Sequence, residues 1–288
     1  MSIHSKAQSS AAKEAINHYT RRAPQYDTGN GGWHITLGQA FVNEVAPQPG
    51  AQCLDLACGT GLVTFPLAAA TGTNGQVIGV DITPAMLDIA RKRTRELDWA
   101  PIEFIEHDVG DLDDVESVQY VLSKHGGFDI ISCCSGLVLL ADPARAIKKW
   151  AELLRPGGKL IADVPTENHT LQYIFSWELR GALNLRSDFN RSWVQDIHSL
   201  EELYTDAGLA VERSWRTGSQ GAGEREYGVE EGERVFEEQV RKYQEFMDPR
   251  KMDETKDAFL KIWVRECECG GGRFVDGHWL YVTIARKA

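Results

Sequence analysis

Short apolar runs alternate with segments of helical periodicity through the middle of this 288-residue chain, and this alternation limits its fold more than any other feature. The apolar runs predict strands at 51–56, 76–80, 102–105, 128–133, 159–164, 209–215 and 279–285. The segments between them predict helices at 62–70, 84–97, 112–124, 143–154 and 200–207. A repeated β-α order with short connections favours a parallel sheet with helices on both faces.

Two stretches do not follow this alternation. Residues 165–198 are rich in aromatic residues, Asn and Arg, and residues 218–277 run from a Gly-rich start through a charged helical segment. Inserts of this length in a compact sheet fold are typical of lids and binding elements. We therefore expect cap inserts at 165–198 and 218–277.

Charge and composition narrow the class of protein. The 31 Lys and Arg residues against 42 Asp and Glu give a net charge of −11, which disfavours nucleic acid as a partner. No apolar run approaches the roughly 20 residues of a membrane span, and the polar N-terminus does not resemble a secretory signal. The six cysteines indicate reduced thiols, and Cys267-x-Cys269 has no second ligand pair, so we expect no metal. A cytoplasmic enzyme that acts on a small molecule is the resulting expectation.

The run from Cys53 to Gly61, CLDLACGTG, ends a predicted strand and opens a predicted helix. Glycines at such a turn let a ligand approach the backbone, and the helix start offers free amides to it. Asp81 ends the next strand, 20 residues beyond Gly61, where a carboxylate can hold ribose hydroxyls. Asp108 follows the third strand and Cys134-Ser135 end the fourth, at the strand ends where open α/β sheets bind ligands.

Two residues distinguish between possible nucleotides. A dinucleotide site would prefer Gly or Ala in place of Thr64, and a pyrophosphate would be repelled by Asp55 just before the turn. S-adenosylmethionine carries an ammonium and a sulfonium, which an acidic group at the strand end favours. The residues therefore favour this methyl donor over NAD.

Four motifs resemble the successive motifs of class I S-adenosylmethionine-dependent methyltransferases: DLACGTG at 55–61, DITPAML at 81–87, HDV at 107–109 and LRPGGKL at 154–160. The chain is most similar to the ubiquinone/menaquinone-biosynthesis type and its fungal secondary-metabolism relatives. The resemblance covers about residues 48–217 and the closing strand at 279–287. It implies an α/β, Rossmann-like seven-stranded sheet whose last strand is antiparallel, with residues 1–47 as an N-terminal helical cap and 48–288 as the methyltransferase domain.

The resemblance also implies a set of cofactor-binding residues. Asp55, Ala57, Cys58, Gly59 and Gly61 would line the methionine part, and Asp81 would bind the ribose diol. The remaining positions implied are Ile82 and Met86 against the adenine, Asp108 and Val109 at its amine, Cys134 and Ser135 beneath the acceptor, and Tyr26 at the methionine carboxylate.

The acceptor site is less defined by the sequence. His34 and His169 are candidates for a general base, although each could equally be an ordinary packing or exposed histidine. Trp33, Tyr173, Trp177 and Trp193 could wall an aromatic or apolar acceptor, and core packing is the alternative for each. The absence of an Asn-Pro-Pro-aromatic motif after the fourth strand argues against methylation of bases or glutamine.

We therefore expect O-, N- or C-methylation of a small, hydrophobic or aromatic natural-product-like acceptor. The alternative is a protein that binds S-adenosylmethionine without transferring its methyl group, as a regulator or a pericyclase-like catalyst. The sequence leaves the oligomeric state open.

Overall fold

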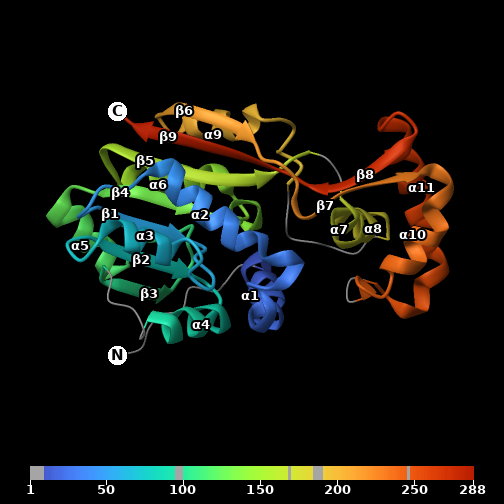
Figure 1. Cartoon of the computed structure of the whole chain (residues 1–288), viewed down its shortest axis with the longest axis horizontal. Helices are drawn as coiled ribbons and strands as arrows, with labels where there is room; N and C mark the ends of the chain where they lie inside the picture. The colour runs from blue at the N-terminus through green and yellow to red at the C-terminus, as the bar shows by residue number, and fades with distance from the viewer. Residues whose placement is uncertain (1–9, 95–99, 168–169, 184–190, 245–246) are drawn as a thin grey trace.

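The computed structural model describes residues 10–94, 100–167, 170–183, 191–244 and 247–288. Its centre is a seven-stranded sheet in the order β3-β2-β1-β4-β5-β9-β6 (Figure 1). The strands are β1 (Gln52–Leu56), β2 (Gln76–Asp81), β3 (Ile102–Glu106), β4 (Phe128–Cys133), β5 (Leu154–Pro165), β6 (Leu209–Arg216) and β9 (Leu280–Lys287). Only β9 runs antiparallel to its neighbours, β5 and β6, among these strands. The expected Rossmann-like sheet is confirmed.

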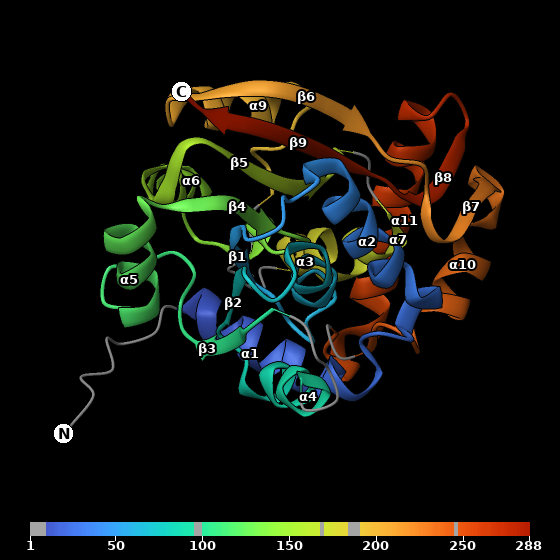
Figure 2. The same cartoon turned by 60° about the vertical axis from the view of Figure 1, so that its left-hand side comes forward.

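Helices cover both faces of this sheet (Figure 2). On one face, α2 (Trp33–Val45) and α3 (Thr64–Thr71) bury Phe41 and Leu67 in one apolar core. On the other, α5 (Glu116–His125), α6 (Pro143–Leu153) and α9 (His198–Asp206) bury Trp150 and Tyr204 in a second. Helix α4 (Pro84–Thr94) packs near β3, and α1 (Ser10–Arg22) packs against α4.

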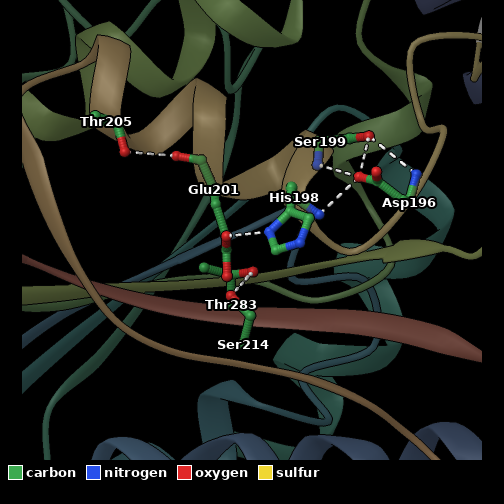
Figure 3. Close-up of polar contacts among 7 residues, drawn as sticks. All are labelled: Asp196, His198, Ser199, Glu201, Thr205, Ser214 and Thr283. Atoms are coloured by element: carbon green, nitrogen blue, oxygen red, sulfur yellow. Dashed lines mark hydrogen bonds and ion pairs between the residues drawn. The ribbon is translucent and has the colours of Figure 1, made fainter.

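Polar side chains cap the start of helix α9 and link the two strands β6 and β9 (Figure 3). The Asp196 carboxylate accepts hydrogen bonds from the backbone amides of His198 and Ser199, which the first turn of a helix leaves free. Across the sheet, the Ser214 hydroxyl on β6 lies 3.0 Å from the Thr283 hydroxyl on β9. The Ser214–Thr283 contact joins β6, the strand before the second insert, to the closing strand β9.

Most of the two predicted inserts forms a separate lobe with its own core, whereas the end of the first insert, at Trp193 and Val194, packs on the core of the main sheet. Helices α7 (Leu171–Tyr173), α8 (Leu179–Ala182), α10 (Gly232–Gln239) and α11 (Met252–Cys269) surround Phe175, Phe259 and Trp263. The lobe lies beyond the carboxyl ends of the parallel strands, to the right in Figure 1. The lobe therefore lies next to the edge where ligands of such sheets bind.

Three local expectations differ from the structure. The Gly-rich start of the second insert forms strand β7 (Gln220–Gly228), which pairs with β8 (Arg273–His278) in a small antiparallel sheet. The helix expected from residue 112 begins at Glu116, because Leu112 and Val115 close a turn before it. The fifth strand begins at Leu154 instead of 159, since Leu154 pairs with Phe128 across an irregular register.

Candidate functional site

The turn after β1 has the backbone shape that its sequence predicts. Ala57, Gly59 and Gly61 all have positive φ angles, of 53°, 54° and 90°. A Cβ on Gly61 would lie 2.5 Å from the Phe65 ring, so only glycine fits there without a shift. The turn thereby brings its backbone to the carboxyl end of the sheet.

Asp81 holds this turn against the end of β2. One of its oxygens accepts a hydrogen bond from the Gly59 amide at 2.8 Å, and the other accepts one from the Thr83 amide at 2.8 Å. The residue is 8% exposed, and burial raises the pKa of its carboxyl. Asp81 is therefore fixed in position while it faces the cavity described next.

A cavity of about 1120 Å³ opens at this edge. It is lined by ten of the predicted cofactor residues: Tyr26, Ala57, Gly59, Asp81, Ile82, Met86, Asp108, Val109, Cys134 and Ser135. Trp150 supports one wall, because its indole N–H donates a hydrogen bond to the Val109 carbonyl at 2.8 Å. The Asp108 carboxylate is oriented by the Gly110 amide, which donates to it at 2.8 Å.

Three further predicted cofactor residues, Asp55, Cys58 and Gly61, are not among the described residues that line the cavity. Asp55 lies below the turn, 1% exposed, where it accepts hydrogen bonds from the hydroxyls of Ser132 at 2.8 Å and Thr64 at 2.6 Å. Burial raises the pKa of its carboxyl to about 7. Asp55 therefore supports the turn from beneath, and Thr64 is its hydrogen-bond partner.

The residues of this cavity fit S-adenosylmethionine. Carboxylates outnumber the cations on its wall, which suits a ligand with an ammonium and a sulfonium. The side chains of Ile82 and Met86 offer an apolar surface for the adenine, and Asp81 offers acceptors for ribose hydroxyls. A Cβ on Gly136 would lie 2.6 Å from the Ala57 Cβ. A larger residue at position 136 would therefore clash with the turn after β1.

A second cavity of about 820 Å³ adjoins the first and shares Tyr19, Ser135 and Leu139 with it. Of the predicted acceptor residues, Trp33, His34, Tyr173 and Trp177 line it. Trp193 is not among the described lining residues, because it packs against the core of the main sheet. His169 lies outside the described residues.

His34 is held between aromatic rings in the second cavity. Its ring centroid lies 3.7 Å from that of Trp33 and 4.6 Å from that of Tyr26. Burial, reinforced by the Arg22 charge, lowers the pKa of His34 to about 3. Its buried Nδ1 has no hydrogen-bond partner within the described part of the chain. The imidazole is therefore neutral at pH 7.

Asp163 lines the same cavity at the end of β5, 1% exposed. It accepts a hydrogen bond from the Ser135 amide at 2.7 Å, and Ser135 is held at a positive φ of 57°. Burial raises the pKa of Asp163 to about 7. This strand-end carboxyl lies at the junction of the two cavities, because Ser135 borders both.

Sequence reasoning did not identify several wall residues as parts of the site. Helix α1 contributes His18, Tyr19 and Arg22, the first insert contributes Arg191, and the end of β8 contributes His278. The His278 ring lies 5.1 Å from that of Trp33, and burial, followed by the Arg191 charge, lowers the pKa of His278 to about 4. The cluster of aromatic and basic residues at 18–22 was the one available signal.

Within the described ranges, no group of three or more His, Cys, Asp or Glu side chains is placed to hold a metal ion. The six cysteines are free thiols, and Cys133, which ends β4, and Cys134, which follows it, do not form such a group. No described helix is both long and apolar enough to cross a membrane.

A Rossmann-like sheet with one antiparallel strand and this donor cavity define a class I S-adenosylmethionine-dependent methyltransferase. The chain belongs to the Methyltransferase domain family, whose pattern matches residues 47–209. S-adenosylmethionine is the methyl donor in this family, and the protein is an enzyme that transfers methyl groups to small molecules.

Relatives and solved structures agree with this family. A demethylmenaquinone methyltransferase of Lactococcus lactis is 32% identical over 180 residues, covering 57% of this chain and 68% of its own. That of Bacillus cereus is 27% identical over 177 residues, covering 56% and 71%. The fold is similar to that of the [4+2]-cyclase SpnF (TM-score 0.59, 15% identity, 96% of each chain). It is also similar to Haemonchus contortus phosphoethanolamine N-methyltransferase 2 in complex with S-adenosyl-L-methionine (TM-score 0.55, 16% identity, 98% of this chain and 61% of that one).

Proposed function

We propose that the enzyme methylates a hydrophobic or aromatic, natural-product-like acceptor that binds in the second cavity. The observation that carries the proposal is the adjacency of the two cavities, which share Tyr19, Ser135 and Leu139. The rings of Tyr173 and Trp177 on that wall are stacked with centroids 6.4 Å apart, and Trp33 adds a third aromatic surface. Such rings suit a flat apolar ligand.

In this proposal the chain's residues bind the donor and bring the acceptor to it. S-adenosylmethionine, when bound, supplies an electrophilic methyl group on its sulfonium. We assign the ribose to Asp81, the adenine to Ile82, Met86, Asp108 and Val109, and the methionine part to the turn and Tyr26. The protein's main contribution is then to hold the acceptor in line and to exclude water.

The N-terminal segment, residues 1–47, is proposed as a cap over both cavities, and residues 1–9 of it lie outside the described part of the chain. Helix α1 supplies Lys13 and Ala15 to the donor cavity, Glu14 and His18 to the acceptor cavity, and Tyr19 to both. An ion pair between Glu14 and Arg180 of α8, at 3.0 Å, joins this helix to the insert lobe. Closure of the cap would exclude water from the transferred methyl group.

Two groups on the acceptor wall are candidates for handling a proton. His34 lines the acceptor cavity between the rings of Trp33 and Tyr26, from where its imidazole can contact an acceptor. Because its pKa is lowered to about 3, it holds a proton weakly at pH 7. Asp163, with a pKa raised to about 7, is the better matched base, although an acidic acceptor would need neither.

The test is product analysis with the full chain, S-adenosylmethionine and a library of small aromatic and apolar acceptors. We expect acceptors that gain one methyl group in step with released S-adenosylhomocysteine, with His34→Gln lowering kcat more than it changes KM for the donor. A conversion that needs S-adenosylmethionine but leaves it unconsumed would instead support the pericyclase-like alternative. Donor binding with no reaction across the library would count against an apolar acceptor.

A further inference from the structure

The loop between helices α1 and α2 links a wall of the donor cavity to a wall of the acceptor cavity. It spans residues 23–32 and contains two short 3₁₀ helices, Ala23–Gln25 and Gly29–Gly32. Tyr26 of this loop lines the donor cavity, and its ring centroid lies 4.6 Å from that of His34, which lines the acceptor cavity. The position of the loop therefore affects both walls.

The sequence of this loop gives it little stiffness of its own. Residues 29–32 are Gly-Asn-Gly-Gly, and Gly31 and Gly32 have positive φ angles of 77° and 69°. Glycine loses more conformational freedom than any other residue when its backbone is fixed. A loop with this sequence therefore needs contacts with the rest of the molecule to hold Tyr26 in one place.

Asp27 makes contacts of this kind. Its Oδ1 accepts a hydrogen bond from the Thr60 hydroxyl at 2.6 Å, and its Oδ2 pairs with the Arg93 guanidinium on α4. The same guanidinium donates a hydrogen bond to the Thr60 carbonyl at 3.0 Å. Three residues that are distant in the sequence thus form a closed set of contacts, the Asp27–Thr60–Arg93 clamp.

The clamp holds the loop against the donor turn from behind the cavity walls. Thr60 is 1% exposed and lies between Gly59 and Gly61 in that turn. Gly59 lines the donor cavity, whereas none of the three clamp residues is among the described residues that line either cavity. A change in the clamp therefore acts on a ligand through the positions of Tyr26 and Gly59.

A contribution to global stability is a poor explanation for the clamp, because ion pairs of partly exposed groups contribute little to it. The Arg93 side chain is 38% exposed and that of Asp27 is 17% exposed. A ligand, in contrast, shifts a loop when it contacts one of the loop's states better than the other. A donor molecule contacts Tyr26 and Gly59 together only while the clamp holds the loop against the turn, so donor binding should favour the closed clamp.

We propose that Asp27 is a positioning residue that couples occupation of the donor cavity to the order of the acceptor wall. Donor binding closes the clamp, and the closed clamp fixes Tyr26 and the His34 ring packed on it. Because such coupling is reciprocal, an acceptor that contacts this wall binds more tightly to the enzyme–donor complex than to the free enzyme. The proposal rests on the proposed function only in treating the second cavity as the acceptor site.

Hydrogen exchange of the full chain measures this coupling, with and without S-adenosylhomocysteine at a concentration that calorimetry shows to saturate each variant. A contact that is only structural would change exchange equally in both states, so the ratio of the two rates is the readout. We expect the ligand to slow exchange of the amides at 23–32 in the wild type by about five-fold or more, a typical size for coupling between sites.

Asp27→Asn removes the ion pair with Arg93, and Thr60→Val removes the hydroxyl donor at nearly constant volume. Each variant should reduce the protection of residues 23–32 by the ligand to about two-fold or less, since the loop is then no longer tied to the turn. Thr60→Ser keeps the hydroxyl and should keep the wild-type protection. Arg93→Gln, at a partly exposed position, replaces either variant that a melting curve shows to be unfolded.

Asp129→Asn is the matched control. The Asp129 side chain is also 17% exposed, pairs with Arg155 and accepts a hydrogen bond from the Gln52 amide at 2.8 Å, but it lies at the start of β4, away from the donor turn. This variant should keep the wild-type protection of residues 23–32.

The proposal is overturned if the ligand leaves exchange of the loop unchanged in the wild type, if Asp27→Asn and Thr60→Val keep the wild-type protection, or if Asp129→Asn loses it as well. Neither measurement uses an acceptor, so this result is separate from that of the acceptor screen. If S-adenosylhomocysteine binds and the loop is not protected, only the clamp fails. If it does not bind, the donor cavity is assigned wrongly and the clamp proposal falls with it.

Discussion

At the scale of single residues, Asp81 does two things at once: it fixes the turn and faces the donor cavity. Both of its oxygens already accept backbone amides, those of Gly59 and Thr83. A ligand hydroxyl must therefore share these oxygens, which a carboxylate allows because it has about four lone-pair positions. The same side chain thus couples the shape of the turn to binding of the donor.

Asp81→Asn should weaken binding of both S-adenosylmethionine and S-adenosylhomocysteine. An amide can accept only one of the two backbone N–H groups well, and hydrogen bonds to charged groups contribute about 1.5–3 kcal/mol, which predicts about 10- to 100-fold weaker binding. Calorimetric titration measures this loss. Asp88→Asn is the control, because Asp88 lies on the exposed side of the neighbouring helix α4, where it pairs with Arg91 at 3.8 Å. Equal affinity in the two variants would contradict the role of Asp81.

At the scale of elements, helix α1 is held at the two cavities by an ion pair that could not be predicted from the sequence. The Glu14–Arg180 ion pair joins residues 166 positions apart, and α1 otherwise packs mainly on α4. Ion pairs of partly exposed groups contribute little to global stability, typically about 0.2–1 kcal/mol. Their effect is instead expected in how often this single helix opens.

Glu14→Gln should therefore raise the hydrogen-exchange rate of the α1 amides by a few-fold and raise the KM for the acceptor. The melting temperature should hardly change, because the two cores of the main sheet do not include this pair. Glu44→Gln is the matched control, since it removes a similar surface ion pair, to Arg213 at 2.9 Å, on helix α2. Faster exchange along α1 in both variants would show that the effect is not specific to the cap.

How far the sequence predicts these elements depends on where their stability comes from. Strand β4 has the predicted bounds, Phe128–Cys133, because its apolar run is buried on both faces and needs no context to be recognised. The residues of the donor turn were likewise predictable, since their backbone angles demand glycine. Strand β7 was missed because Gly221 and Gly223 interrupt any alternation, and its pairing with β8 shifts register between Gln220 and Arg225.

The acceptor wall was predicted only in part, for a related reason. Trp33, His34, Tyr173 and Trp177 were found from their chemistry and their place near motifs. Arg191 comes from the first insert and His278 directly follows the second, and only the folded chain brings them to one cavity. Trp193 has the same chemistry as Trp177 but packs on the main core, a difference that tertiary contacts alone decide.

At the scale of the whole molecule, the main sheet and the insert lobe have separate cores, each with one fully buried tryptophan at its centre. The Trp150 indole donates to the Val109 carbonyl of the donor cavity, and the Trp263 indole donates to the Val229 carbonyl in the lobe, at 3.0 Å. Removing either indole should therefore affect one cavity more than the other.

Trp150→Phe should weaken donor binding, whereas Trp263→Phe should leave it within about two-fold and reduce acceptor binding. Trp150→Phe leaves the buried Val109 carbonyl without its partner and should destabilise the main core by about 1–3 kcal/mol. The cost should be smaller for Trp263→Phe, because Val229 is 44% exposed and water can replace the indole. Titration with S-adenosylhomocysteine and with the acceptor, on both variants, gives the four affinities that are needed. Loss of donor binding in Trp263→Phe would mean that the two cores unfold as one unit.

The buried carboxyls and histidines make opposing contributions to the pH dependence of stability. The pKa of Asp55 and that of Asp163 are raised to about 7, so the native state binds more protons than the unfolded chain between roughly pH 4 and 7. Their contribution to stability is complete below pH 4 and is lost as the pH rises through 7. His34 and His278 have pKa values lowered to about 3 and 4, and their contribution is gained as the pH rises towards 6.5.

The contributions of the carboxyls and of the histidines to the free energy of unfolding partly cancel in the wild type. The informative quantity is therefore the difference in this free energy between a variant and the wild type. Asp163→Asn removes one term that falls with pH, while the amide oxygen can still accept the Ser135 amide. The free energy of unfolding of this variant, measured by urea denaturation from pH 4 to 8, should therefore rise with pH relative to the wild type. Asp129→Asn, which removes a carboxyl that pairs with Arg155 near the opposite end of β4, should not reproduce this slope. A parallel pair of curves for wild type and Asp163→Asn would mean that folding does not raise the pKa of Asp163, which would then be a weaker base for the acceptor.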